Sequence, residues 1–107
     1  MECVYREGGN NVFWNLKDEV FSNQNQLSTS NAQSQIKSWA AEEGVSESAI
    51  QNCIDSGDAM SEVEADSMEG QELGASGTPT SFVNGQKLVG AQPYSQFESV
   101  IEEELNN

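Results

Sequence analysis

Turn, strand and loop signals are combined in one short segment, Gly74-Ala-Ser-Gly-Thr-Pro-Thr-Ser-Phe-Val-Asn-Gly-Gln-Lys-Leu-Val-Gly90. Asn84-Gly85 stands between two short apolar runs, and a type I′ turn requires a positive φ at both of its central residues. We therefore expect two antiparallel strands, over about 79–83 and 86–89. Adjacent apolar residues in each strand, Phe82-Val83 and Leu88-Val89, place apolar side chains on both faces of the hairpin. Such a hairpin belongs inside a layered domain.

Thr78-Pro79-Thr80 leads into the first of these strands. Proline is tolerated at the start of a strand, because its missing N–H breaks no ladder bond there, and Gly77 allows a sharp change of direction. On base rates alone the Thr78–Pro79 bond is trans, since only about 5% of X-Pro bonds in folded proteins are cis.

The order of these motifs resembles the C-terminal end of DsbA-like thiol-disulfide oxidoreductases of the thioredoxin superfamily. The segment 74–94 is the most specific part of the resemblance, which covers nearly the whole chain. The motifs that carry it are Gly77-Thr78-Pro79-Thr80, Phe82-Val83-Asn84-Gly85, Gly90-Ala91-Gln92-Pro93-Tyr94, and upstream Glu2-Cys3, Phe13-Trp14, Asp18, Phe21-Ser22-Asn23-Gln24 and Cys53-Ile54-Asp55-Ser56-Gly57. By this resemblance Pro79 is cis, and Thr78 and Pro79 bind the substrate peptide beside a redox disulfide.

The chain departs from the family because it contains no Cys-X-X-Cys motif. We therefore nominate no catalytic residue and expect the electron-carrying cysteines to lie outside these residues. The fold that we predict is an α/β, thioredoxin-like domain with a helical insertion, represented by its C-terminal portion. Residues 1–107 form one domain portion, with the insertion over 1–73 and the proline loop, hairpin and final helix over 74–107.

The insertion is expected to consist of helices with apolar stripes. Residues 1–7 end a first helix at Gly8-Gly9, and Ser30 with Gln33 forms a capping box for a helix that runs to Glu43. Ser46 caps a short helix that stops at Gly57, and a fourth helix covers about 58–73. Pro93 begins the final helix. The insertion side chains expected to face the core are Phe13, Trp14, Leu16, Val20, Phe21, Ala32, Ile36, Trp39, Ala40, Ala49, Ile50, Cys53, Ile54, Met60, Val63, Ala65 and Met68. The final helix has an apolar stripe that is expected to lie on one face of the hairpin, formed by Tyr94, Phe97, Val100, Ile101 and Leu105.

Cys3 and Cys53 are the only cysteines, fifty positions apart. A bond between them would stabilise the fold by about 4 kcal/mol on the chain-entropy estimate. Relatives of the family often carry a cysteine at each equivalent place, which favours a structural disulfide over two free thiols or a redox pair. The absence of histidine excludes the usual Cys/His zinc sites and histidine-based triads, so we expect neither metal nor cofactor.

The 18 acidic residues against 4 basic ones give a net charge of −14. This charge excludes nucleic acid and anionic membrane surfaces as partners, since binding them requires Lys and Arg. A solvated acidic surface, which also suits a halophilic protein because salt screens the self-repulsion, is favoured over a specific acidic site for basic or unfolded clients. No apolar run approaches the roughly 18 residues of a membrane span.

Met1–Glu7 has neither the basic start nor the apolar stretch of a signal peptide. Taken alone it indicates a cytoplasmic protein, whereas the resemblance implies an extracytoplasmic or periplasmic one. We therefore expect part of a longer precursor or a split domain.

Two functions remain open from the sequence. In the first, the chain is the substrate-docking part of a disulfide oxidoreductase, with Thr78 and Pro79 placing the cysteine of a client protein or peptide. In the second, it is a non-catalytic thioredoxin-like module that binds extended peptides. A lone hairpin is marginal in water, so either function needs further strands, from a second copy or from another polypeptide.

Overall fold

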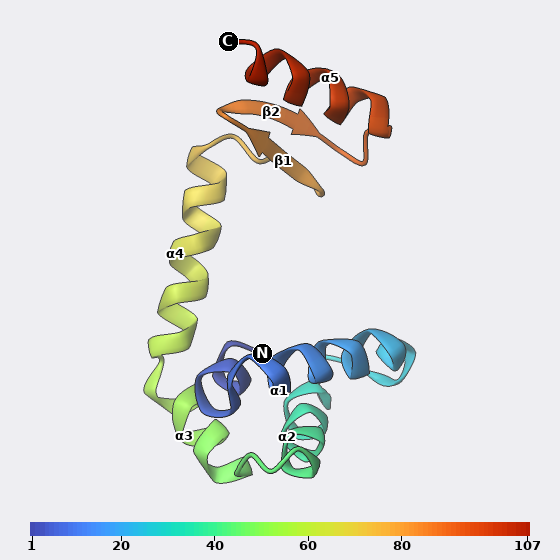
Figure 1. Cartoon of the computed structure of the whole chain (residues 1–107). Helices are drawn as coiled ribbons and strands as arrows, with labels where there is room; N and C mark the ends of the chain where they lie inside the picture. The colour runs from blue at the N-terminus through green and yellow to red at the C-terminus, as the bar shows by residue number, and fades with distance from the viewer. The chain divides into compact units, whose positions relative to one another are not determined.

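The computed structural model describes residues Met1 to Asn107 and divides them into two compact units, Met1–Glu64 and Ala65–Asn107. The helices and strands in chain order are α1 (Glu2–Ser22), a short 3-10 helix (Gln24–Gln26), α2 (Ala32–Glu42), α3 (Glu47–Ser56), α4 (Asp58–Glu72), β1 (Thr80–Val83), β2 (Gln86–Val89) and α5 (Tyr94–Leu105), as Figure 1 shows. This is the predicted sequence of helices, hairpin and final helix. The sequence placed its internal boundary after Leu73, whereas the compact units divide inside α4. No helix combines the length and apolar character that crossing a membrane requires.

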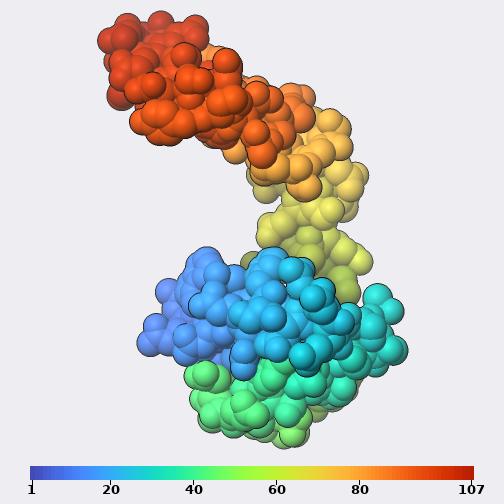
Figure 2. Space-filling view, turned by 90° about the vertical axis from the view of Figure 1, so that its right-hand side faces the viewer, coloured from blue at the N-terminus to red at the C-terminus, as the bar shows by residue number.

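The first unit contains every fully buried side chain of the molecule. Helix α1 packs on α2 and α3, and Figure 2 shows the atoms of these helices, blue to green, in direct contact. The largest of the fully buried side chains are Leu16, Ile50 and Val4. The whole buried cluster consists of Cys3, Val4, Leu16, Ala40, Val45, Ile50 and Ala59, with Val12, Ile36, Trp39, Cys53 and Ile54 packed around it.

Two glycines interrupt α1 where the sequence predicted a helix end. Gly9 has a φ of 80° and a ψ of −172°, so the helix is kinked there. Gly8 lies so close to Val45 that a Cβ built on it would be 2.8 Å from the Val45 Cγ2 atom. The first glycine therefore permits close packing and the second permits the change of direction.

The ends of α3 follow the predicted capping chemistry. The Ser46 hydroxyl accepts a hydrogen bond from the Ala49 backbone N–H at 3.3 Å, and Gly57 ends the helix in the left-handed conformation. The predicted capping box at Ser30 is wrong. Helix α2 begins after Asn31, which makes no side-chain cap, and the Ser30 hydroxyl instead pairs with that of Ser28.

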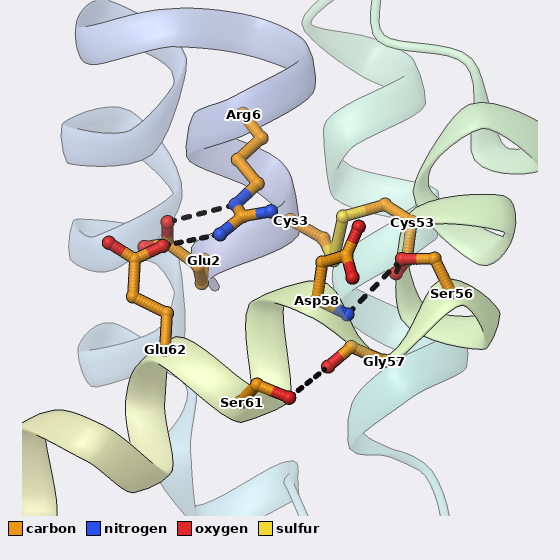
Figure 3. Close-up of polar contacts among 9 residues, drawn as sticks. All are labelled: Glu2, Cys3, Arg6, Cys53, Ser56, Gly57, Asp58, Ser61 and Glu62. Atoms are coloured by element: carbon orange, nitrogen blue, oxygen red, sulfur yellow. Dashed lines mark hydrogen bonds and ion pairs between the residues drawn. A yellow bond between two sulfur atoms is a disulfide. The ribbon is translucent and has the colours of Figure 1, made fainter.

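The bond between Cys3 and Cys53 joins α1 to α3, with their Cα atoms 5.8 Å apart (Figure 3). The Arg6 guanidinium donates hydrogen bonds to the carboxylates of Glu62 and Glu2, and so fastens the start of α4 to α1. Both bonds raise the pKa of Arg6, the bond to Glu62 more than the bond to Glu2. The Cys3–Cys53 bond means that the chain has a structural disulfide and not two free thiols.

Several apolar side chains that the sequence assigned to the core are exposed. Trp14 and Phe21 on α1 are 55% and 64% exposed, because only the Leu16 side of that part of the helix meets other helices. On α4, only Ala59 is buried. Helical spacing identifies an apolar stripe, but it does not show whether another element covers that stripe. The exposed side chains of the α4 stripe are Met60, Val63, Ala65 and Met68.

The second unit contains the predicted hairpin and the final helix. Strands β1 and β2 pair antiparallel with Val83 opposite Gln86, and the turn residues Asn84 and Gly85 have φ values of 49° and 85°. Helix α5 packs against β1 through its stripe, in which Phe97 and Val100 are half-buried. Tyr94 and the other stripe residues at positions 101 and 105 are exposed, and no residue of this unit is fully buried.

Candidate functional site

The candidate site begins where α4 ends. The Ala75 N–H donates to the Gly70 carbonyl at 2.9 Å, and the Gly74 N–H donates to the Gln71 carbonyl at 3.0 Å. Gly74 has a φ of 82°. These two bonds and the left-handed glycine form the Schellman arrangement that stops a helix. The chain thus leaves α4 in a fixed direction and enters the loop that carries Thr78 and Pro79.

The loop is held at both of its ends. The Thr80 hydroxyl donates to the Gly77 carbonyl at 2.6 Å, and the Gly90 N–H donates to the Pro79 carbonyl at 2.7 Å. The Thr78–Pro79 peptide bond is cis, the isomer that the resemblance implied. Thr78 and Pro79 are both exposed. The structure therefore presents these two residues to solvent on a loop that is tied to the hairpin.

The outer edge of β1 continues directly from this loop. Hydrogen-bonded and non-hydrogen-bonded pairs alternate along an antiparallel ladder, and the bond from Gly90 to Pro79 fixes the alternation here. The backbone groups of Thr80 and Phe82 consequently point away from β2. Two strands make up the whole sheet, so no further strand occupies this edge. It is a row of free donors and acceptors beside Pro79.

One face of the hairpin lies against α5 and the other does not. Gln86 donates a hydrogen bond to Glu104 of α5, which identifies its face as the covered one. The opposite face carries Phe82 and Val89, which are 42% and 44% exposed. Lys87 lies on this same face, and its ammonium donates to the Gly74 carbonyl at 3.1 Å. Phe82 and Val89 thus form an exposed apolar strip beside the free edge of β1.

A hollow of about 320 Å³ opens beside Thr78. It lies between the last turns of α4 and the loop. Its lining consists of Ser67, Gly70, Gln71, Ala75, Ser76, Gly77 and Thr78. No local sequence pattern identifies Ser67, Gln71 or Ser76 as lining residues, because they come from a helix and a loop that are brought together only by the fold. The pairing of Thr80 with Val89, in contrast, follows from the Asn84-Gly85 turn.

The cysteines belong to the other unit and have a different environment. Cys3 is only 5% exposed and lies in the apolar cluster, while Cys53 is half-buried. Neither sulfur is a free thiol. Near the Cys3–Cys53 disulfide, the Ser56 hydroxyl accepts a hydrogen bond from the Asp58 N–H, and the Ser61 hydroxyl donates one to the Gly57 carbonyl (Figure 3). These two hydrogen bonds connect the end of α3 to the start of α4. The disulfide is part of the packing of the helices.

The structure contains no group of three or more His, Cys, Asp or Glu side chains arranged to hold a metal ion. A second pocket is an apolar groove of about 270 Å³ in the first unit. The groove is lined by Met1, Glu2, Cys3, Val4, Ala32, Gln33, Ile36, Ile50, Ile54, Ala59, Met60 and Val63. Because its walls offer few polar groups, it lacks the convergent donors and acceptors of a catalytic site.

Comparison with known protein families gives one match. Residues 3–102 match the family described as DSBA-like thioredoxin domain. The match includes both cysteines, the Thr78–Pro79 loop, the hairpin and most of α5. No curated protein and no solved structure matches the chain.

Proposed function

Because the chain belongs to the family of DSBA-like thioredoxin domains, we propose that it is the client-docking part of a thiol-disulfide oxidoreductase. In this proposal Thr78 and Pro79 hold an extended segment of the client, with the client cysteine next to the loop. The redox pair is supplied by another segment or by another polypeptide. The family to which the chain belongs is thiol-disulfide oxidoreductase-like, and the docking role is the step that we add.

The free edge of β1 is the observation that carries the proposal. Thr80 and Phe82 direct their backbone groups outward immediately after the exposed Thr78 and Pro79. An extended peptide can add to such an edge as a further strand, gaining main-chain hydrogen bonds that do not depend on its sequence. Exposed Phe82 and Val89 add an apolar contact for alternate peptide side chains.

The state of the cysteines supports a separation of client docking, in this chain, from electron transfer, in another segment or polypeptide. The chain contains only Cys3 and Cys53, and they are bonded to each other inside the helical unit. A buried structural disulfide is inert compared with the exposed, low-pKa thiols that exchange with substrates. Electron transfer to or from a client therefore requires cysteines other than these two. A partner that brings further strands would also complete a sheet that now has two strands.

Members of this family generally work outside the cytoplasm, where disulfides form and persist. We propose the same location for this chain. The Cys3–Cys53 bond supports it, because structural disulfides are rare in reducing compartments.

Matched proline variants of the two hairpin strands test the docking role. Phe82 and Lys87 face each other in the register, and each directs its N–H away from the partner strand. Phe82→Pro removes a donor from the β1 edge, and Lys87→Pro removes one from the β2 edge, without breaking a ladder bond in either case. We expect Phe82→Pro to weaken the binding of an extended, cysteine-containing peptide by about 10-fold or more, a typical loss for one or two hydrogen bonds.

The peptide affinity is measured by fluorescence anisotropy on the full chain, with circular dichroism to verify that each variant keeps its helices. Lys87→Pro should bind more tightly than Phe82→Pro, and Lys87→Ala, which keeps the N–H, accounts for the lost bond to the Gly74 carbonyl. Phe82→Ala, which also keeps the N–H, separates the edge from the aromatic contact. Equal losses in Phe82→Pro and Lys87→Pro, or no peptide binding by the parent chain, would refute docking at β1.

A non-catalytic binding module is the second candidate, and the absence of a free cysteine favours it. The two functions differ in what happens when a polypeptide with a Cys-X-X-Cys motif is added. A docking part should increase the rate at which that polypeptide reduces the disulfide of a bound peptide, whereas a binding module should leave the rate unchanged. In both cases peptide binding should survive the double substitution Cys3→Ser, Cys53→Ser, provided that the variant stays folded.

A further inference from the structure

The C-terminal end of α4 carries negative charge that no cation of the helix offsets. Its last turn contains Glu69 and Glu72 and no basic residue. A helix C-terminus already has the negative end of the macrodipole, so cations are favoured there and carboxylates are not. This end forms one wall of the hollow beside Thr78, through Ser67, Gly70 and Gln71.

The chain itself places an ammonium group against this segment. Lys87 is the only basic residue of the unit Ala65–Asn107, and its Nζ atom donates to the Gly74 carbonyl just beyond α4. A carbonyl-rich helix end thus has one cation bound from within the chain. The last turn of α4 alone carries two carboxylates, so its negative charge exceeds that single positive charge.

The hollow is also chemically suited to a basic side chain. The hydroxyls of Ser67, Ser76 and Thr78 and the amide of Gln71 supply oxygen acceptors, and the small residues Gly70, Ala75 and Gly77 leave space. An ammonium or guanidinium group donates several hydrogen bonds and accepts none, so it can pair with these oxygen atoms. An acidic side chain in the hollow would meet the negative end of the helix dipole.

We propose that the loop binds extended peptides carrying a Lys or Arg beside the residue that docks at Thr78, with the cationic group in this hollow. The inference rests on the proposed docking function and specifies its client class. At low ionic strength, charge also disfavours a second copy of the chain as the occupant of this edge. Two molecules with a net charge of −14 repel each other, whereas a basic segment is attracted.

Three peptides of one backbone sequence test this client class. Each has about six residues with apolar side chains at alternate positions, and they differ only in carrying Lys, Gln or Glu next to the central cysteine. We expect the Lys peptide to bind the full chain at least about 10-fold more tightly than the Glu peptide at an ionic strength of about 0.05 M. The difference should fall below about 3-fold near 1 M salt, where the Debye length is only about 3 Å.

A pair of charge variants locates the effect. Glu69→Gln with Glu72→Gln removes two charges at the end of α4, and Glu102→Gln with Glu103→Gln removes two near the hairpin turn. Glu102 and Glu103 are neighbours of Glu104, which accepts a hydrogen bond from Gln86 at the hairpin turn. The turn end of β1 is about 17 Å from Thr78, so this pair is distant from the hollow. The first variant should reduce the preference for Lys over Glu by about 3-fold or more, and the second should reduce it less.

The outcomes separate this inference from the docking function. Equal binding of all three peptides, or equal effects of the two variants, would overturn the inference and leave docking intact. If none of the peptides binds, the docking function itself fails. A dimer seen by analytical ultracentrifugation at low salt would contradict the choice of a basic peptide over a second copy.

Discussion

Gly8 and Gly9 show how single residues shape the helical unit. The left-handed backbone at Gly9 kinks α1, and the missing side chain at Gly8 lets Val45 approach within contact distance. Val45 is 8% exposed and belongs to the buried cluster. The glycine pair thus brings the chain segment after α2 into the core.

Adding a methyl group at Gly8 should destabilise the protein. In Gly8→Ala the new Cβ would lie 2.8 Å from the Val45 Cγ2 atom, where one of the two must shift, and 3.0 Å from Val12, which is a tight contact. Overpacking of this kind costs about 1–3 kcal/mol of unfolding free energy. Urea denaturation followed by circular dichroism measures it.

Gly70→Ala is the matched control, because Gly70 lies inside α4 with no atom within 4 Å of its would-be Cβ. The same substitution should there leave the stability unchanged or raise it by up to about 1 kcal/mol, since alanine favours the helix. A loss of stability in Gly70→Ala equal to that in Gly8→Ala would show that the packing against Val45 is not the cause.

At the scale of elements, serine residues before two helices look alike in sequence and differ in the structure. Ser46 caps α3 through its hydroxyl, whereas the Ser30 hydroxyl pairs with the Ser28 hydroxyl. The Asn31 side chain occupies the turn before α2 instead, accepting from the Ser28 N–H at 2.7 Å and donating to the Gln26 carbonyl at 2.9 Å. The local turn competes with the capping box and prevails.

Alanine substitutions at the two serines should therefore differ in effect. Ser46→Ala removes an acceptor from the first turn of α3 and should cost about 1 kcal/mol of stability. Ser30→Ala removes only an exposed contact between hydroxyls, and we expect a change within about 0.5 kcal/mol. Thermal unfolding of both variants checks the difference. A larger loss of stability in Ser30→Ala than in Ser46→Ala would show that Ser30 does cap α2.

At the scale of the whole molecule, the burial of side chains is confined to one unit. All seven buried hydrophobic residues lie between Cys3 and Ala59. The hairpin and α5 hold together through half-buried residues such as Leu88 and Phe97, and β1 and β2 form a two-stranded sheet. The helical insertion and the C-terminal portion of the thioredoxin-like fold are thus present, with the insertion well packed and the hairpin open on one face.

Hydrogen exchange should reveal this difference in stability. Local opening costs least where few apolar contacts are buried, so the Leu88 amide should exchange roughly 100-fold faster than the Leu16 amide after correction for intrinsic rates. Leu88 is bonded within the hairpin and Leu16 within α1, so both amides are formally paired. Similar protection at the two sites, measured by NMR on the full chain, would show that the hairpin is stable without further strands.

The sequence by itself determined the local features. The hairpin and its register follow from Asn84-Gly85, the limits of α3 from Ser46 and Gly57, and the break in α1 from Gly8-Gly9, because these depend on residues a few positions apart. The resemblance added the pairing of Cys3 with Cys53 and identified Thr78 and Pro79. Only the tertiary structure decided which apolar stripes are covered, which strand edge is free and where a hollow opens beside Thr78. Burial depends on elements that are distant in sequence, so helical spacing alone assigned the exposed Trp14 and Met60 to the core.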